Sequence, residues 1–481
     1  MSRESAQWPN RMNASDALFW FLDTVPELRS TIGALMIFGG RPAPRATRAA
    51  MARLVAEVPR LRQLVVEAPW NLAPPEWLDD PQFDLDYHLR TIAVPAPGGV
   101  LELLEELGPL YASPLDHNRP LWEAYVVEGL FDGRAAMFLK MHHCLMDGVG
   151  GSRLFGALLS DPGREGLDVY DEIARGPRSF SLAARVWRAL VYDVSEAVGL
   201  ASDVAGMIAD VVLHPWQVIE ELPAAVRRTL GFGRELAVPR ADSPLRHRRS
   251  LSRQLATFEM SLTEIDGARQ RLSATNNDIV LTIVSGALHR WHTSRGADVK
   301  ELRALVPVNL RGGSEEEAGN HLALLAMSLP IGEPDCLTRL RTIQQRMGEV
   351  KADRRAVLYP VMARVLTALP LALAAEAGRQ QTYRTNLLCT NVPGPRHTCY
   401  LAGETIEAVY PFAPLVGDHP VGIAFFSYRD TMYVGLDVDP LAMADLPHFV
   451  DALAESYAEV RNVALRAPAA ARDAQERDWS I

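Results

Sequence analysis

Two adjacent histidines, His142 and His143, are the residues in this 481-residue sequence whose type and spacing best fit acid–base chemistry. They lie where a strand-like run over residues 135–141 meets a glycine-rich turn that begins at Gly148. Adjacent side chains on an extended chain point to opposite faces, so the two rings cannot both serve one substrate or one metal ion. One ring would face a cleft as a general base for an alcohol, while the other packs inward. Simple packing of a histidine at a strand end is the alternative.

Other kinds of site fit this segment less well. His143 and Asp147 could approach one ion, but no third ligand follows at a recognisable spacing, so no zinc site is predicted. Residues 148–153 end in arginine and lack both the third glycine of a dinucleotide fingerprint and a P-loop lysine. No G-x-S-x-G nucleophile elbow is present. The four scattered cysteines predict reduced thiols.

The composition is that of an ordinary globular protein, with 48% hydrophobic and 22% charged residues. A net charge of −10 argues against a protein that wraps nucleic acid. The N-terminus is polar and has no apolar secretory stretch, and charged residues interrupt the apolar segments at 186–213 and 356–378. We therefore expect a cytoplasmic protein without a membrane-spanning helix.

Hydrophobic periodicity predicts a mixed α/β chain in two parts. Helices are expected after a cap at Ser15-Asp16, over 186–212, from a Ser261-to-Glu264 capping box to Leu272, from a cap at Asn277 or Asp278 to Trp291, and over 446–460. Strands are expected over 33–38, 121–127, 135–141, 302–308, 322–329, 383–390, 421–428 and 432–437. Proline and glycine near residues 215–239 mark the crossover between the two parts.

The segment from His142 to Gly148 matches the HHxxxDG motif of coenzyme A-dependent acyltransferases. Shorter matches in the same order extend the likeness over nearly the whole chain, so that the sequence resembles the bacterial wax ester synthase/diacylglycerol acyltransferase family. These matches are at residues 15–19, 59–63, 83–88, 119–123, 277–278, 307–311, 319–320, 391–395 and 427–428.

This resemblance implies two α/β sandwich domains like chloramphenicol acetyltransferase, with the active site in a tunnel at their interface. The N-terminal acyltransferase domain with the motif would span 1–180. A helical segment and crossover linker would span 181–250, and the C-terminal acyltransferase domain 251–481.

The resemblance also implies roles for the motif residues. His143 would be the general base, and the deprotonated alcohol would attack the thioester directly, without a covalent acyl-enzyme. His142 and Asp147 would complete the catalytic motif, and Gly148 would contact substrate. Asp147 would hold the loop by pairing with Arg311, although capping of the following helix is an equally simple role.

Asn277 and Asn391 are further candidates for substrate binding. Either amide could stabilise the negative charge that develops on the thioester oxygen. Asparagine at a helix start or before a Pro-Gly turn is also commonly used to satisfy backbone groups, so both alternatives stay open. Asn309 and residues 412–414 depart from the family pattern, which leaves the acceptor preference open.

The expected function is esterification of a long-chain fatty alcohol or diacylglycerol, with acyl-CoA as substrate and with no metal or other cofactor. The alternatives are a condensation-type transferase with an acyl-carrier-protein donor and a non-catalytic lipid-binding protein. Peripheral association with the inner membrane or lipid bodies is compatible with such substrates. The basic run Arg246 to Arg249 could attract lipid head groups or the phosphates of coenzyme A, or could be a solvated loop. Acyl length and oligomeric state are left open.

Overall fold

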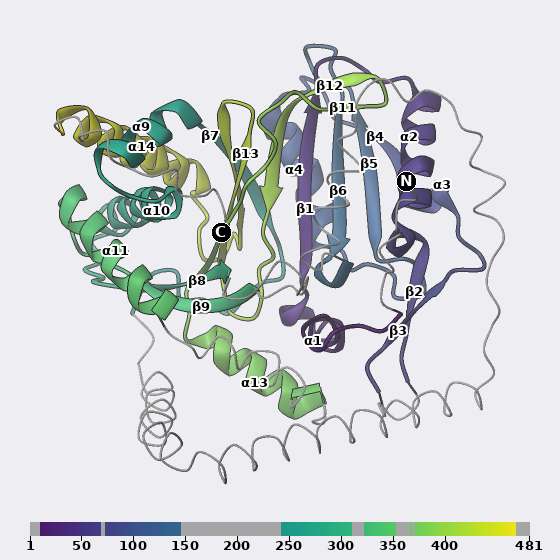
Figure 1. Ribbon diagram of the computed structural model, residues 1–481, viewed down its shortest axis with the longest axis horizontal. Coiled ribbons are helices and arrows are strands. Elements are labelled where there is room, and N and C mark those ends of the chain that lie inside the picture. Colours follow the sequence, from purple (N-terminus) through teal and green to yellow (C-terminus); the bar gives the residue numbers. More distant parts are fainter. Residues whose placement is uncertain are drawn as a thin grey trace, which may run out of the picture.

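Two six-stranded sheets form the framework of the protein in the computed structural model (Figure 1). The structure describes residues 10–68, 73–145, 242–309, 322–352, 366–367 and 371–467. The mixed α/β class with two sheet-and-helix domains, predicted from the sequence, is confirmed. Within the described residues, no helix has the length and apolar character needed to cross a membrane.

The first sheet contains the strand that carries the histidine pair. Its strand order is β11-β12-β1-β6-β5-β4. The strands are β1 (Thr31–Phe38), β4 (Leu89–Ala93), β5 (Trp122–Glu128), β6 (Ala136–His142), β11 (Tyr400–Leu401) and β12 (Glu404–Phe412). The accompanying helices and turns are α1 (Ala14–Leu22), η1 (Pro26–Leu28), α2 (Pro44–Glu57), η2 (Pro59–Arg62), α3 (Leu85–His88), α4 (Val100–Ala112) and η4 (His143–Leu145), with a small hairpin of β2 (Gln63–Val66) and β3 (Glu76–Asp79). Strand β6 is buried at every position, because elements cover both of its faces.

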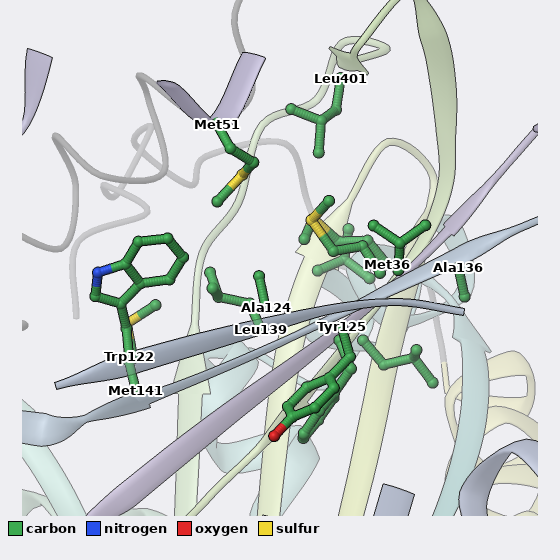
Figure 2. Close-up of a cluster of buried hydrophobic side chains, with 14 of the residues drawn as sticks. Met36, Met51, Trp122, Ala124, Tyr125, Ala136, Leu139, Met141 and Leu401 are labelled. Carbon is green, nitrogen blue, oxygen red and sulfur yellow. The ribbon is translucent and has the colours of Figure 1, made fainter. Parts of the chain in front are cut away.

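Figure 2 shows the apolar layer on the two faces of this sheet. Met51 of α2 and Leu401 of the edge strand β11 point toward the central strands of the sheet, which present Met36, Leu139 and Trp122 among their buried side chains. The side chains in this layer are at most 5% exposed for Met36, Met51, Trp122, Leu139 and Leu401. The tight packing of this core fixes the direction of β6 and therefore the place at which the histidine pair emerges.

The second sheet has the order β7-β14-β13-β10-β8-β9. Its strands are β7 (Gln254–Ser261), β8 (Leu302–Asn309), β9 (Leu322–Leu329), β10 (Leu387–Val392), β13 (Val421–Tyr428) and β14 (Thr431–Val438). Helices α9 (Leu262–Arg271), α10 (Asn276–Thr293), α11 (Cys336–Ala352) and α14 (Leu446–Arg466) gather on one side of it (Figure 1). Helix α13 (Leu371–Tyr383) lies apart from them and packs against α1 and η1.

The two halves of the chain share the first sheet. Strand β12, from the second half, pairs antiparallel with β1, and Gly33 lies opposite Phe412. The two sheets also approach closely at Gly435, where an added Cβ atom would clash with the carbonyl oxygen of Pro411. Only glycine fits such a backbone contact. The sequence patterns did not predict β11 or β12, and the boundaries at 180 and 250 stay a prediction.

Helix starts differ from the predicted ones because other side chains cap the backbone. Asn13, rather than Ser15-Asp16, caps α1 and accepts the backbone N–H of Asp16 at 2.8 Å. Thr275 caps α10, and Asp278 completes a capping box by accepting the backbone N–H of Thr275 at 2.9 Å.

Two other predicted segments have different outcomes. The helix that begins after Ser261 is confirmed, with the Ser261 side chain as its cap. The strand predicted over 383–390 is wrong in its first part, because α13 extends to Tyr383 and β10 begins only at Leu387. The helix predicted over 186–212 lies outside the described residues.

Candidate active site

The histidine pair lies at the end of β6, where the chain turns into η4. Strand β1 holds the last residue of β6 by pairing Thr31 with His142. One residue later, the backbone N–H of His143 donates to the carbonyl of Ser30 at 2.8 Å. Helix α1 packs against η4 from the other side. The backbone of both histidines is therefore fixed between β1 and α1.

His142 is fully buried, and its two ring nitrogens have different neighbours. The backbone N–H of Cys144 donates to Nδ1 at 3.2 Å, while Nε2 lies 3.1 Å from Oδ1 of Asp23. Because Nδ1 accepts a hydrogen bond, the proton of a neutral ring resides on Nε2, next to the carboxylate. His142 is thus oriented by groups inside the protein.

Asp23 connects this ring to the surrounding loops, and sequence reasoning missed it. Its carboxylate accepts from His117 Nε2 at 2.8 Å and from the backbone N–H of Ser30 at 3.3 Å. Burial would raise the pKa of Asp23, but hydrogen bonds and charge interactions with His117 and His142 outweigh it and lower the pKa below the ordinary value. Asp23 therefore supports His142 directly and His143 through Ser30.

No sequence signal identifies this carboxylate. Asp23 follows α1 directly, and His117 is 94 residues further along the chain. Trp20 lies over the His117 ring with the ring centroids 4.4 Å apart. The indole and the histidine meet only after β1, β5 and β6 have brought the two loops together.

His143 is only half-buried, unlike its neighbour. Phe19 of α1 packs on its ring with the ring centroids 4.5 Å apart. Within the described part of the chain, its buried Nδ1 atom has no hydrogen-bond partner in another residue. Burial lowers the pKa of His143 to about 4. The nearby His142 adds to this shift, while a backbone hydrogen bond of His143 itself opposes it. The imidazole is therefore neutral at physiological pH and available to accept a proton.

The remaining predicted site residues are distributed over different parts of the chain. Asp147, Gly148 and Arg311 lie outside the described residues. Asn277 is half-buried in the first turn of α10, a helix that packs against α9, α11 and α14.

Asn391 is near the end of β10, in register with Phe425. It follows Leu387, which pairs with Val421, by four residues, or about 13 Å along the strand. The roles of both asparagines stay predictions.

Two further observations bear on chemistry at this site. All four cysteines are buried and unpaired with one another, and burial is the main cause that raises the thiol pKa of Cys144, which contacts His142. A thiol in this state is a poor nucleophile. Across the described ranges, no three His, Cys, Asp or Glu side chains converge as metal ligands would.

Comparison with known proteins gives a consistent result. Residues 12–280 match the model of the wax ester synthase/diacylglycerol acyltransferase catalytic domain, and residues 318–461 match the C-terminal domain of the same family. A Mycobacterium tuberculosis protein, whose name gives diacylglycerol O-acyltransferase as a provisional activity, is 31% identical over 428 residues, covering 86% of this chain and 84% of its own. The O-acyltransferase WSD of Acinetobacter baylyi is 30% identical over 378 residues, covering 75% of this chain and 77% of its own.

Solved structures share the architecture. The wax ester synthase/diacylglycerol acyltransferase of Marinobacter aquaeolei VT8 matches with a TM-score of 0.63 and 26% identity, covering 94% of this chain and 99% of its own. The first condensation domain of the calcium-dependent antibiotic synthetase has a TM-score of 0.57 at 14% identity, covering 96% and 98%, which shows a common fold.

Proposed function

The chain belongs to the wax ester synthase/diacylglycerol acyltransferase family and is an acyltransferase, and we propose that it moves a long-chain acyl group from acyl-CoA onto a lipid alcohol. The acceptor would be a long-chain fatty alcohol or diacylglycerol, and the product a wax ester or triacylglycerol. The observation that carries this proposal is the neutral, half-buried ring of His143 at the end of β6. His142 differs in having its ring engaged by Asp23 and Cys144.

In the proposed reaction, His143 removes the hydroxyl proton as the alcohol oxygen attacks the thioester carbonyl carbon. The carbon–sulfur bond then breaks, and the imidazolium returns the proton to the departing thiolate. The ring starts the cycle neutral, because burial keeps its pKa low, so no prior deprotonation is needed. The hydrogen bond from His143 N–H to Ser30 O and the contact with Phe19 support the ring against displacement.

We propose that Asp147 pairs with Arg311 to hold the loop after the motif, and that Gly148 contacts the substrate. Asn277 or Asn391 would donate to the thioester oxygen in the transition state. Removal of such a donor costs about 3 kcal/mol in the transition state, or roughly a hundredfold in rate.

We also propose that the enzyme works at the surface of the inner membrane or of lipid bodies, where its acceptor resides. Support comes from a loop pair at the start of α4, where the backbone N–H of Phe131 donates to Gly98 at 3.0 Å. Leu101 and Phe131 there are 72% and 75% exposed. Large apolar side chains at a loop tip can enter the boundary of a lipid layer.

The test is thiol release from palmitoyl-CoA by purified protein, with hexadecanol, dioleoylglycerol or no acceptor. We expect thiol release that depends on the acceptor and falls to background in His143→Ala. The acceptor that gives the faster release identifies the product as a wax ester or a triacylglycerol. Cys389→Ser is a matched control, since Cys389 is buried in the hydrophobic core of the second sheet. Release that survives loss of His143 would reject the mechanism, and transfer seen only from an acyl-carrier protein would reject the donor.

A further inference from the structure

A basic pocket of about 500 Å³ lies beside the active-site loops and is not used by the chemistry described above. Arg246, Arg248 and Arg249 of the crossover segment line it, together with Arg379 of α13. Glu27 and Asp418 are the two acidic residues in its lining. Four guanidinium groups thus face two carboxylates, a local excess of positive charge in a chain whose net charge is −10.

Arg249 shows that this pocket is built from the fold rather than from surface side chains alone. It is 8% exposed, and its Nη1 donates to the carbonyl oxygens of Glu27 at 3.1 Å, Gly417 at 3.3 Å and Leu415. Its buried Nε–H has no acceptor within the described part of the chain. A buried donor without a partner is costly unless a ligand or solvent supplies the acceptor. Burial lowers the pKa of Arg249 to about 10, which still leaves it charged at neutral pH.

The other arginines are at the surface of the pocket, and Arg379 also lies 3.9 Å from the carboxylate of Glu376 on its own helix. Arg246, Arg248 and Arg379 are exposed, and Arg246 donates to the phenol oxygen of Tyr383 at 3.2 Å. This bond ties the crossover segment to the end of α13, so that guanidinium groups from both elements face one cavity. Arginine clusters of this kind recognise phosphate through charge-assisted, bidentate hydrogen bonds.

The position of the pocket suits one particular phosphate source. Its wall includes Glu27, only three residues before Ser30, whose carbonyl accepts the N–H of His143. Three extended residues span at most about 11 Å. The pantetheine arm of coenzyme A contains about as many backbone bonds as four residues, roughly 14 Å, between its thiol and its pyrophosphate. A thioester at His143 therefore allows the phosphates of the same molecule to reach this pocket.

We propose that the pocket between the crossover segment and α13 binds the phosphate groups of the acyl-CoA donor. This inference rests on the proposed function for its ligand, but it concerns a separate set of residues. Arg246, Arg248 and Arg379 would neutralise the phosphates, and the buried Arg249 would hold the loops at Glu27 and Gly417 that shape the wall. The same phosphate chemistry is present in acidic lipid head groups, so the two sources need separate measurements.

The test compares Arg246→Glu and Arg379→Glu with Arg466→Glu, an exposed arginine at the end of α14. Isothermal titration calorimetry would measure the binding of coenzyme A, of adenosine 3′,5′-bisphosphate and of pantetheine, which lacks phosphate. We expect each pocket variant to weaken the first two ligands at least tenfold, with no change for pantetheine or in Arg466→Glu. Added salt should reduce the difference, because the arginines are exposed.

Two outcomes would overturn the proposal. One is unchanged binding of coenzyme A and the bisphosphate in both variants. The other concerns vesicles: the pocket variants would bind phosphatidylglycerol-containing vesicles more weakly than the parent protein does, while their binding of coenzyme A and of pure phosphatidylcholine vesicles stays unchanged. That result would assign the pocket to a lipid surface. Calorimetry needs no turnover, so an inactive protein with pocket-dependent coenzyme A binding would reject the proposed reaction and keep this site. An active protein whose pocket variants bind coenzyme A as tightly as the parent would keep the proposed reaction and reject this site.

Discussion

The low pKa of His143 predicts an unusual acid limb in the pH dependence of turnover. A histidine with the ordinary pKa of 6.5 is only about 3% neutral at pH 5, whereas one with a pKa of about 4 is about 90% neutral. If neutral His143 is the base, kcat at pH 5 should stay near nine-tenths of its plateau. An ordinary base would give about a thirtyfold loss.

The assay should report kcat at saturating palmitoyl-CoA, so that titration of the donor's own phosphates does not enter. Released thiol can be followed with 4,4′-dithiodipyridine, which reacts in mild acid, and tryptophan fluorescence would check that the protein is folded at each pH. A midpoint near 6.5 in kcat would refute the reasoning that burial controls this base.

A single substitution provides the internal control. Phe19→Ala removes the ring that packs on His143 and admits water to it, so the pKa should rise toward 6.5. We expect activity at pH 5 to fall severalfold relative to pH 7.5 in this variant. Phe21→Ala, on the same helix but packed into the cluster around Leu22 and Leu28, should keep the parent profile. Identical profiles for all three proteins would mean that burial under Phe19 does not set the pKa.

Three further predictions concern the surroundings of the site. Asp23→Asn removes the charge beside His142 and His117. The free energy of unfolding in urea should therefore fall by about 2 kcal/mol and kcat by roughly tenfold. Full activity of this variant would exclude a supporting role for Asp23. Burial lowers the pKa of His88 and His292 to about 4, so protonation of either ring opposes folding. The free energy of unfolding should be highest above pH 6.5 and should decrease as pH falls toward 4, by up to about 3 kcal/mol for each histidine. Urea midpoints measured at pH 7.5, 6 and 5 check this, and constant midpoints would contradict it. Phe131→Ser should reduce sedimentation with phosphatidylcholine vesicles without changing turnover of dispersed substrate, and unchanged sedimentation would argue against insertion of this tip.

The sequence predicts the elements of this fold better than their connections. Strands at 33–38, 135–141 and 421–428 are found almost as predicted, because long buried apolar runs with clear ends are strong local signals. Strand β12 was missed, since Pro411 and the two glutamates of this segment are typical of a loop, and only pairing with β1 makes it a strand. The cap of α1 was shifted because Asn13 and Ser15 are equally good by residue type.

The site residues could be predicted from the sequence only where they are adjacent in the chain. His142 and His143 are neighbours in sequence, so the motif can be recognised, but the half-exposed ring of His143 arises because the chain leaves β6 at His142 and turns into η4. Asp23 and His117 support the motif from distant loops, and no spacing rule connects residues that meet only in the tertiary structure. The basic run at Arg246 was visible, but its partner Arg379 on α13 was not.

The pairing of β12 with β1 has a consequence for synthesis of the chain. Without β12, strand β1 is the edge of the first sheet, and it is buried on both faces and rich in apolar residues. Between the end of β6 at His142 and the end of β12 at Phe412, a ribosome adds 270 residues (412 − 142), which takes about 15 to 55 s at ordinary rates. An open apolar edge of this kind invites pairing with other chains during that time. We therefore expect the nascent chain to depend on a chaperone, or on low temperature in a heterologous host, until its second half is made and β12 covers this edge.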